Sequence, residues 1–171
     1  ARTQAVRGIA LELERLANHT GDLGALAGDV GFLPTQNYCG AIRGDFLNLT
    51  ALLCGSRLGR DLLRPGGVVF NLDAARIDEL RRRLDRIEAD VSGAVNLMFG
   101  VSSVPARFED TGKVERVQAT AIGLVGPAAR ASGLARDVRQ DYPSGIYQVY
   151  HLPVSTWESG DVYARAMVRW L

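Results

Sequence analysis

The most constraining feature of this sequence is an apolar repeat between residues 74 and 99. Its apolar side chains recur at steps of three and four residues: Ile77, Leu80, Leu84, Ile87 and Val91. This spacing places them along one stripe of an α-helix, and so regular a stripe packs lengthwise against another helix. Asp73 precedes the repeat and is a favoured N-cap residue. The repeat therefore predicts a long helix within a helical bundle.

Two further helices are predicted upstream of this repeat. Residues 3–29 carry apolar side chains at helical spacing, and Pro34 suits the first turn of a second helix over residues 34–55. The end of the first helix contains four glycines: Gly21, Gly24, Gly28 and Gly31. Each glycine weakens a helix by ~1 kcal/mol relative to alanine. We therefore expect another backbone or a ligand to approach this helix closely.

The rest of the chain predicts short elements. RPGGVVFNL (64–72) indicates a turn followed by an extended piece, and ERVQATAIGLV (115–125) a short helix. IYQVYHLPV (146–154) alternates like a strand and predicts half of a hairpin that turns near residues 158–160. A last apparent helix is still apolar at Leu171, which is typical of a piece of a longer protein. The expected fold is mainly α, a helical bundle core with a small β-hairpin or sheet, in one domain over residues 1–171.

Composition excludes several classes of partner. The formal net charge is +1 and aromatic residues make up 7% of the chain. Neither nucleic acid nor an anionic membrane is therefore expected to bind through charge or base stacking. No apolar run reaches the ~18 residues of a transmembrane helix, and the first residues do not resemble a signal peptide. A cytoplasmic location follows as the expectation.

Cysteines and histidines give little support for a metal site. Cys39 and Cys54 lie in the same predicted helix. Their separation of ~22 Å along it is too large for a disulfide. There is no C-x-x-C motif, and His19 and His151 are far apart in the sequence. We predict that both cysteines are small buried hydrophobic residues, that both histidines are core residues, and that this chain supplies no metal ligand.

Three segments, taken in order, resemble one family. They are RGIALELERLANHTGDLGALAGDVGF (7–32), GSRLGRDLLRPGGV (55–68) and VGPAARASGLARDVRQDYP (125–143). Together they resemble the large subunit of energy-converting, group 4 nickel–iron hydrogenases and the homologous 49 kDa subunit of respiratory NADH–quinone oxidoreductase. HTGDLGALAGDVGF and GLVGPAARASG are more similar to the hydrogenase side, including formate-hydrogenlyase types.

The resemblance implies a central fragment of a redox subunit. Its partners would be an iron–sulfur small subunit and membrane subunits, with the complex peripheral to the cytoplasmic membrane. The C-x-x-C pairs that hold nickel and iron in the family are absent from these residues, and Gly59 stands where respiratory relatives have a cluster-tuning histidine. Ser144 follows Pro143 where the family commonly has tyrosine. The fragment is thus expected to bind no cofactor itself, while the parent uses a nickel–iron centre or quinone, with iron–sulfur clusters on a partner.

The resemblance also implies roles for particular residues. Asp29 matches an aspartate that orients a quinone-site histidine in the quinone-reducing relatives. An ionised carboxylate there stabilises the protonated imidazole. In a hydrogenase Asp29 would belong to a proton path, and it could equally cap a turn. Four other residues are expected near the cluster or the subunit interface: Arg64, Arg130, Asp137 and Arg139.

The stretch GPAARASGLARDVRQDYP (126–143) concentrates fixed charge among glycines. If it faces a partner subunit, its charges are enclosed, and enclosed charges are tolerated when paired. We predict that Arg130 and Arg139 are each at least half buried and within reach of a carboxylate. A guanidinium near a cluster would raise its potential; the alternative is purely structural pairing, which we prefer for Arg136. Glu12 is a candidate proton relay or inter-helix anchor as well as an ordinary helix residue.

Three functions remain open from the sequence. The chain is a fragment of a hydrogenase-type large subunit that passes electrons between the iron–sulfur subunit and the active site, a quinone-site subunit of the 49 kDa type, or a metal-free scaffold. The isolated fragment should be inactive. It should also self-associate, because the apolar surface that partners normally cover would be exposed.

Overall fold

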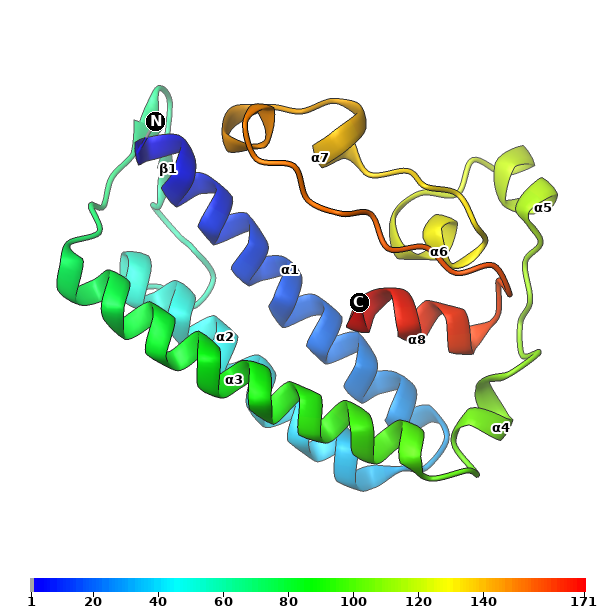
Figure 1. Ribbon diagram of the computed structural model, residues 1–171. Helices are drawn as coiled ribbons and strands as arrows, with labels where there is room; N and C mark the ends of the chain where they lie inside the picture. The colour runs from blue at the N-terminus through cyan, green and yellow to red at the C-terminus, as the bar shows by residue number, and fades with distance from the viewer. Residues whose placement is uncertain (1) are drawn as a thin grey trace.

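Three long helices form one half of the molecule, and short helices joined by irregular segments form the other half (Figure 1). The structure is a computed structural model that describes residues 2–171. The first half contains α1 (Arg2–Asp29), α2 (Leu33–Cys54), β1 (Leu63–Arg64), β2 (Gly67–Val68) and α3 (Ala74–Gly100). The second half contains α4 (Pro105–Phe108), α5 (Arg116–Ala121), α6 (Gly126–Ala131), α7 (Val138–Asp141), the 3-10 helix η1 (Gly145–Gln148) and α8 (Val162–Trp170).

The long helices begin and end at residues suited to those places. Pro34 lies in the first turn of α2, and Gly55 ends that helix in the left-handed conformation at φ 75°. The Asp73 side chain caps α3 by accepting the Arg76 N–H at 2.8 Å. The helices predicted over residues 3–29, 34–55 and 74–99 are therefore confirmed within one residue at each end.

The main core lies between these helices, with α2 packed against both α1 and α3. Leu80 and Ile87 of the predicted apolar stripe are buried in it, while Leu84 and Val91 are half-buried at its edge. The largest fully buried side chains in this bundle include Leu23, Leu49, Leu53, Val95 and Met98. The stripe thus packs lengthwise against a neighbouring helix, as its spacing predicts.

The glycines of α1 allow close packing. A Cβ added at Gly24 would lie 2.8 Å from Cys39 Cβ on α2, a separation that real Cβ atoms do not reach. At Gly8, an added Cβ would lie 2.6 Å from Cγ2 of Ile146 in η1. The expected close approach of other chain segments to α1 is confirmed, and it occurs on two sides of that helix.

A two-stranded antiparallel hairpin follows α2. Leu63 pairs with Val68 and Arg64 with Gly67, and Gly66 takes a φ of 79° in the turn between them. The predicted turn and the short extended piece after it are confirmed. The hairpin lies beside the start of α1 (Figure 1).

One prediction for the second half is wrong, and another is confirmed only in part. Residues 145–148 form η1 instead of the beginning of a strand, and residues 149–159 have no regular structure, so there is no hairpin near residue 160. The predicted helix over 115–125 ends at Ala121. A strand needs a partner to satisfy its backbone, whereas this segment turns Tyr147 inward against α1.

Backbone hydrogen bonds join distant parts of the second half. The Trp157 N–H donates to Arg130 O, and the Gly160 N–H donates to Ala131 O, both at 2.9 Å. Asp161 caps α8 by accepting the Ala164 N–H at 2.8 Å. These links hold α6 against α8, which itself packs on α1.

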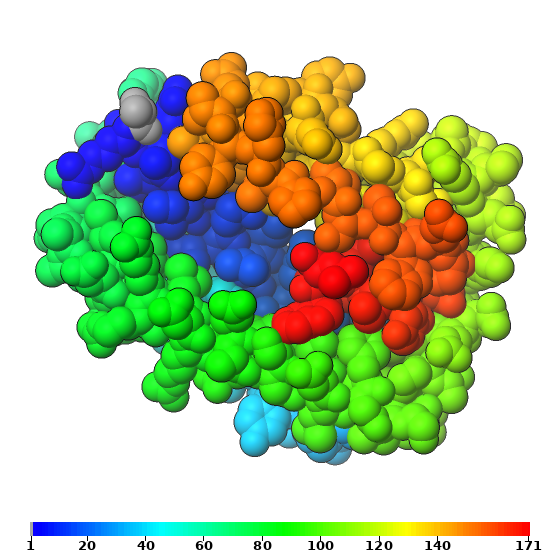
Figure 2. Space-filling model, viewed as in Figure 1, coloured from blue at the N-terminus to red at the C-terminus, as the bar shows by residue number. Residues whose placement is uncertain are grey.

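The surface is hollowed where α1 lies between the two halves. Figure 2 shows α1 (dark blue) as the floor between the 138–150 segment (orange), α3 (green) and the C-terminal residues (red). A cleft of about 510 Å³ opens between α1, α3 and the end of α8, and Leu16, Leu84 and Trp170 line it. Among the helices of residues 2–171, none has the length and apolar character that crossing a membrane requires.

Candidate functional site

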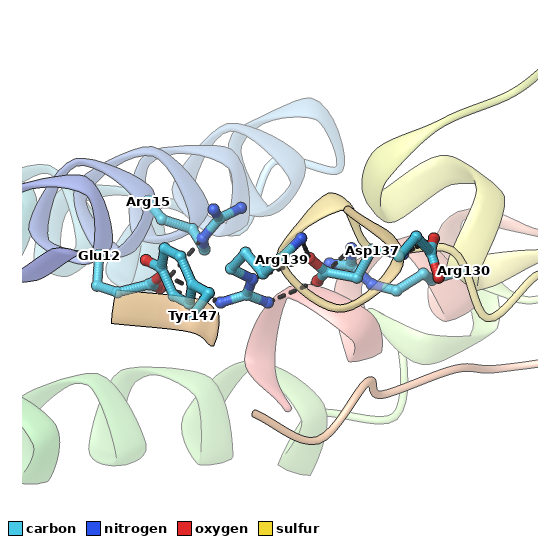
Figure 3. A network of polar contacts seen from close by, with 7 residues as sticks. Glu12, Arg15, Arg130, Asp137, Arg139 and Tyr147 are labelled. Atoms are coloured by element: carbon cyan, nitrogen blue, oxygen red, sulfur yellow. Dashed lines mark hydrogen bonds and ion pairs between the residues drawn. The ribbon is translucent and has the colours of Figure 1, made fainter. Parts of the chain in front are cut away.

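A chain of charged side chains connects the two halves of the molecule (Figure 3). It begins in α6, passes through α7, and ends on α1 and η1. Its members are Arg130 of α6, Asp137 and Arg139 at the start of α7, Glu12 and Arg15 of α1, and Tyr147 of η1.

Asp137 is the centre of the inner end. Arg139 binds it with two nitrogens: Nη2 lies 2.6 Å from Asp137 Oδ2, and Nε lies 2.9 Å from Oδ1. Arg130 Nη1 lies 3.6 Å from the same Oδ2. The exposed fractions of the side chains are 7% for Arg130, 5% for Asp137 and 14% for Arg139. The predicted burial and pairing of Arg130 and Arg139 are confirmed.

Glu12 anchors the outer end. It accepts hydrogen bonds from Arg139 Nη1 at 3.1 and 3.2 Å, from Arg15 Nε at 3.1 Å, and from the Tyr147 hydroxyl. Arg139 and Tyr147 follow Glu12 by 127 and 135 residues. Glu12 is therefore an anchor between distant segments, one of the roles predicted for it.

Burial and hydrogen bonding within the network shift the pKa values of its members. The Arg139 hydrogen bond, opposed by burial, lowers the pKa of Asp137 to about 2. The pKa of Arg139 is raised, chiefly by its hydrogen bond to Asp137. Burial lowers the pKa of Arg130, an effect that Asp137 opposes. Burial, followed by the bond to Glu12, raises the pKa of Tyr147 to about 12.

These shifts define what the site can do chemically. Near neutral pH, Asp137 stays ionised and Tyr147 keeps its proton. The inner network therefore acts through fixed charge. Its two guanidiniums, Arg130 and Arg139, and the single carboxylate of Asp137 give it a formal charge of +1. Because Asp137 and Arg130 are buried, this positive charge is weakly screened by solvent.

The other predicted site residues lie outside the network. Asp29 is exposed at the end of α1, 17 residues from Glu12 and thus ~25 Å away along the helix. Arg64 is exposed in the β1–β2 hairpin, and Arg136 is exposed just before α7. The structure therefore brings Arg130, Asp137 and Arg139 together and leaves Asp29 and Arg64 apart from them.

The cysteines behave as apolar residues. Both are free and buried in α2, and burial raises the pKa of the Cys39 thiol to about 11. Cys54 Sγ donates to Thr50 O at 3.4 Å. Residues 2–171 contain no cluster of three or more histidine, cysteine, aspartate or glutamate side chains that could hold a metal ion.

The histidines differ from each other. His19 is half-buried beside the 510 Å³ cleft, where burial, followed by Arg169, lowers its pKa to about 4. His151 is exposed, so its predicted core position is wrong. The reason is that the strand on which the prediction depended does not form.

Two members of the network were not predicted. Arg15 follows Glu12 by three residues, and this spacing on one helix face could have indicated the pair. Tyr147 had no local signal, because its contact with Glu12 depends on the path of the intervening chain.

Comparisons with known proteins give a consistent result. Residues 29–171 match the family model described as respiratory-chain NADH dehydrogenase, 49 Kd subunit. An NADH-quinone oxidoreductase subunit of Clostridium beijerinckii is 32% identical over 98% of this chain and 45% of its own length. The carbon monoxide-induced hydrogenase of Rhodospirillum rubrum is 31% identical over 99% of this chain and 47% of its own length.

A solved structure shares the fold. It is the membrane-bound sulfane sulfur reductase, an archaeal respiratory membrane complex, with a TM-score of 0.89 and 26% identity over 99% of this chain and 46% of the matched chain. The chain spans less than half the length of each of these three relatives. The mainly helical fold with a small sheet is therefore confirmed.

Proposed function

Because the chain belongs to the family of the 49 kDa subunit of respiratory-chain NADH dehydrogenases, we propose that it is the central part of the large subunit of a membrane-attached oxidoreductase. In the parent complex, electrons pass between an iron–sulfur small subunit and the active site. We assign the parent to the group 4 nickel–iron hydrogenase type. The similarity to a carbon monoxide-induced hydrogenase supports this assignment. The complex is peripheral to the cytoplasmic membrane, beside membrane subunits.

The observation that carries this proposal is the enclosed positive charge. Arg130 and Arg139 are held around Asp137, with little exposure to solvent. A fixed positive charge stabilises the more negative, reduced form of a nearby cluster and so raises its reduction potential. The network would perform this task without exchanging protons, because its inner members do not titrate near neutral pH.

This chain's own residues do not fit a metal centre. Cys39 and Cys54 are buried within the helical bundle, and Cys39 has a raised thiol pKa, which disfavours the thiolate that a metal requires. The nickel–iron centre of the proposed parent and its clusters would therefore be held by other residues or subunits. The role assigned to this chain is electrostatic and structural.

The second candidate is a quinone-site subunit of the 49 kDa type. It is favoured by the similarity to subunits of NADH-quinone oxidoreductases. The resemblance would also make Asp29 the counterpart of an aspartate near the quinone in that group. Gly59, in place of the cluster-tuning histidine, speaks against it.

The electrostatic role is tested in the full-length subunit within its complex. Arg139→Gln should lower the midpoint potential of the nearest cluster, measured by redox titration with electron paramagnetic resonance, because it removes the enclosed charge. Arg139→Lys, which keeps the charge, should retain most of the potential. The matched control is Arg136→Gln, which removes an exposed arginine three positions away and should leave the potential unchanged. Equal potentials in all three variants would reject the electrostatic role.

The type of parent is tested with Asp29→Asn in the same complex. Loss of quinone reduction would identify the quinone-site type, and loss of hydrogen evolution would support the hydrogenase type. If neither activity changes, Asp29 only ends α1. A parent complex that shows neither activity before mutation would be a scaffold, and the proposed function would be wrong.

Exposed apolar side chains in the second half support the presence of partners. Tyr142 is 80% exposed, Val117 80% and Val149 73%. Exposed apolar side chains favour burial against another protein where they gather into a patch. The isolated chain should therefore self-associate, and light scattering that finds only monomers across a wide concentration range would contradict this expectation.

A further inference from the structure

A groove of about 960 Å³ runs between α1, α2, the β1–β2 hairpin and η1. Its walls carry three arginines, Arg7, Arg43 and Arg57, and a single carboxylate, Glu14. All three arginines are exposed, and within the described chain none of them forms an ion pair. The groove therefore offers an excess of unpaired positive charge.

The positive charges are spread along the groove. Arg7 Nη1 donates to Gly67 O at 3.4 Å, at the hairpin end. Arg43 lies beside Gly21, where an added Cβ would be 3.0 Å from Arg43 Cδ. Residues 7 and 21 of α1 are 14 positions apart, or ~21 Å along the helix. One phosphate or carboxylate cannot span this distance, whereas about six residues of extended polypeptide can.

Apolar side chains accompany these charges. Leu11 is 43% exposed, Leu63 55% and Leu58 71%, and all three line the groove. Leucines in such positions favour an occupant that is itself partly apolar. The guanidinium fork binds carboxylates with two parallel hydrogen bonds, which favours carboxylates as the charged groups of the occupant.

We propose that this groove binds an acidic polypeptide segment of a partner protein, about six extended residues long, in which carboxylates are interspersed with apolar side chains. The segment lies along α1 between the hairpin and Arg43, with its carboxylates on the three arginines. This inference goes beyond the proposed function and does not depend on it, because it requires no redox centre. The groove shares only Tyr147 with the buried network.

The test uses the full-length subunit without its partner subunits and a fluorescent octapeptide of alternating glutamate and leucine, followed by fluorescence anisotropy. We expect binding that weakens as the salt concentration rises, because the pairs are solvent-accessible. The double variant Arg43→Glu, Arg57→Glu should weaken binding by at least about tenfold. An octapeptide of alternating lysine and leucine should not bind.

The matched control reverses the charge of two exposed arginines on α3. Arg81→Glu with Arg86→Glu changes the net charge by the same amount, away from the groove, and should change binding by less than about twofold. Circular dichroism and thermal melting check that each variant folds. Arg7→Gln, at the other end of the groove, supplies an independent variant if the double variant does not fold.

Several results would overturn the proposal. They are failure of the acidic octapeptide to bind at millimolar concentration, equal binding of the basic octapeptide, and an equal loss in the α3 control. Competition by inorganic phosphate, or arginine-dependent binding to vesicles containing phosphatidylserine in place of the peptide, would assign the groove to a phosphate group. Light scattering that shows a dimer broken by Arg57→Glu would assign it to a second copy of this chain.

Discussion

The bundle of α1, α2 and α3 and the region from residue 101 to 171 are stabilised in different ways. The bundle has one continuous core that contains large side chains such as Phe46, Leu49 and Met98. Val104, Phe108 and Ala166 of the second region join that core, and the clusters that lie within the second region itself are small and built largely from alanines. Small side chains remove little apolar area from water, so these clusters contribute little stabilisation.

The second region depends on polar links at defined positions instead. Asp137 holds two arginines, and the backbone of Gly160 joins residues 114 and 131. In the bundle, stability is shared among many apolar contacts, whereas here it is concentrated in a few groups. A change of one polar or glycine residue should therefore cost more in the second region than a comparable change on the bundle.

The largest effect is expected for Asp137→Asn. The substitution leaves the buried Arg130 without a carboxylate and Arg139 with Glu12 alone. Breaking a buried ion pair costs about 3 to 5 kcal/mol. Urea unfolding of the chain measures this loss, and hydrogen exchange should locate it in residues 101–171.

The matched control on the bundle is Asp90→Asn. Asp90 is 49% exposed and lies 3.7 Å from Arg86 within α3. An exposed pair of this kind contributes about 0.5 kcal/mol or less. Equal losses in the two variants would contradict the contrast between the regions.

The second effect is expected for Gly160→Ala. Gly160 has a φ of 69°, and an added Cβ would lie 2.1 Å from Val114 O. Alanine is strained at this left-handed φ, and its Cβ would force the backbone at Val114 to move. Together these effects should lower the free energy of unfolding by about 2 to 4 kcal/mol. Thermal or urea unfolding measures the loss.

Gly93→Ala is the corresponding change on the bundle, and it should have the opposite sign. Gly93 lies within α3, where an added Cβ meets no atom within 4 Å. Alanine should therefore stabilise the helix by up to about 1 kcal/mol. Destabilisation by both substitutions would show that α3 is less regular than its packing indicates.

The smallest effect concerns pH at the contact between the regions. His19 of α1 has its pKa lowered from 6.5 to about 4, by burial first and then by Arg169, Arg15 and Arg130, with Asp22 acting in the opposite direction. The folded state binds a proton at His19 less readily than the unfolded chain does. The stability that this difference provides is therefore fully present above pH 6.5 and is lost as the pH falls towards 4. The free energy of unfolding should fall by about 2 kcal/mol over this range, after solvent screening is allowed for.

Urea unfolding between pH 7 and 4.5 measures this dependence. His19→Gln should flatten the profile, whereas His151→Gln, at an exposed histidine, should leave it unchanged. Asp137 does not interfere, because its pKa is lowered from 3.8 to about 2 and its contribution is lost only below about pH 4. A profile that is unaltered by His19→Gln would contradict the shift.

The sequence predicted the bundle well and the second region in part. Apolar spacing and the end residues Pro34, Gly55 and Asp73 located the three long helices, because helices are selected by local patterns. The alternating pattern at 146–154 failed, since a strand requires a distant partner that this fold does not provide. The burial of Arg130 and Arg139 was predicted from the charge of the segment together with the family resemblance.

By itself, the sequence determined the long helices, the turn at Pro65 and Gly66, and the family to which the chain belongs. Only the tertiary structure decided that Tyr147 and Arg139 meet on Glu12, that Asp29 lies apart from them, and that three unpaired arginines share one groove. The physical reason is range: helix propensity and capping act within a few residues, whereas these contacts join residues that only the packed chain brings together.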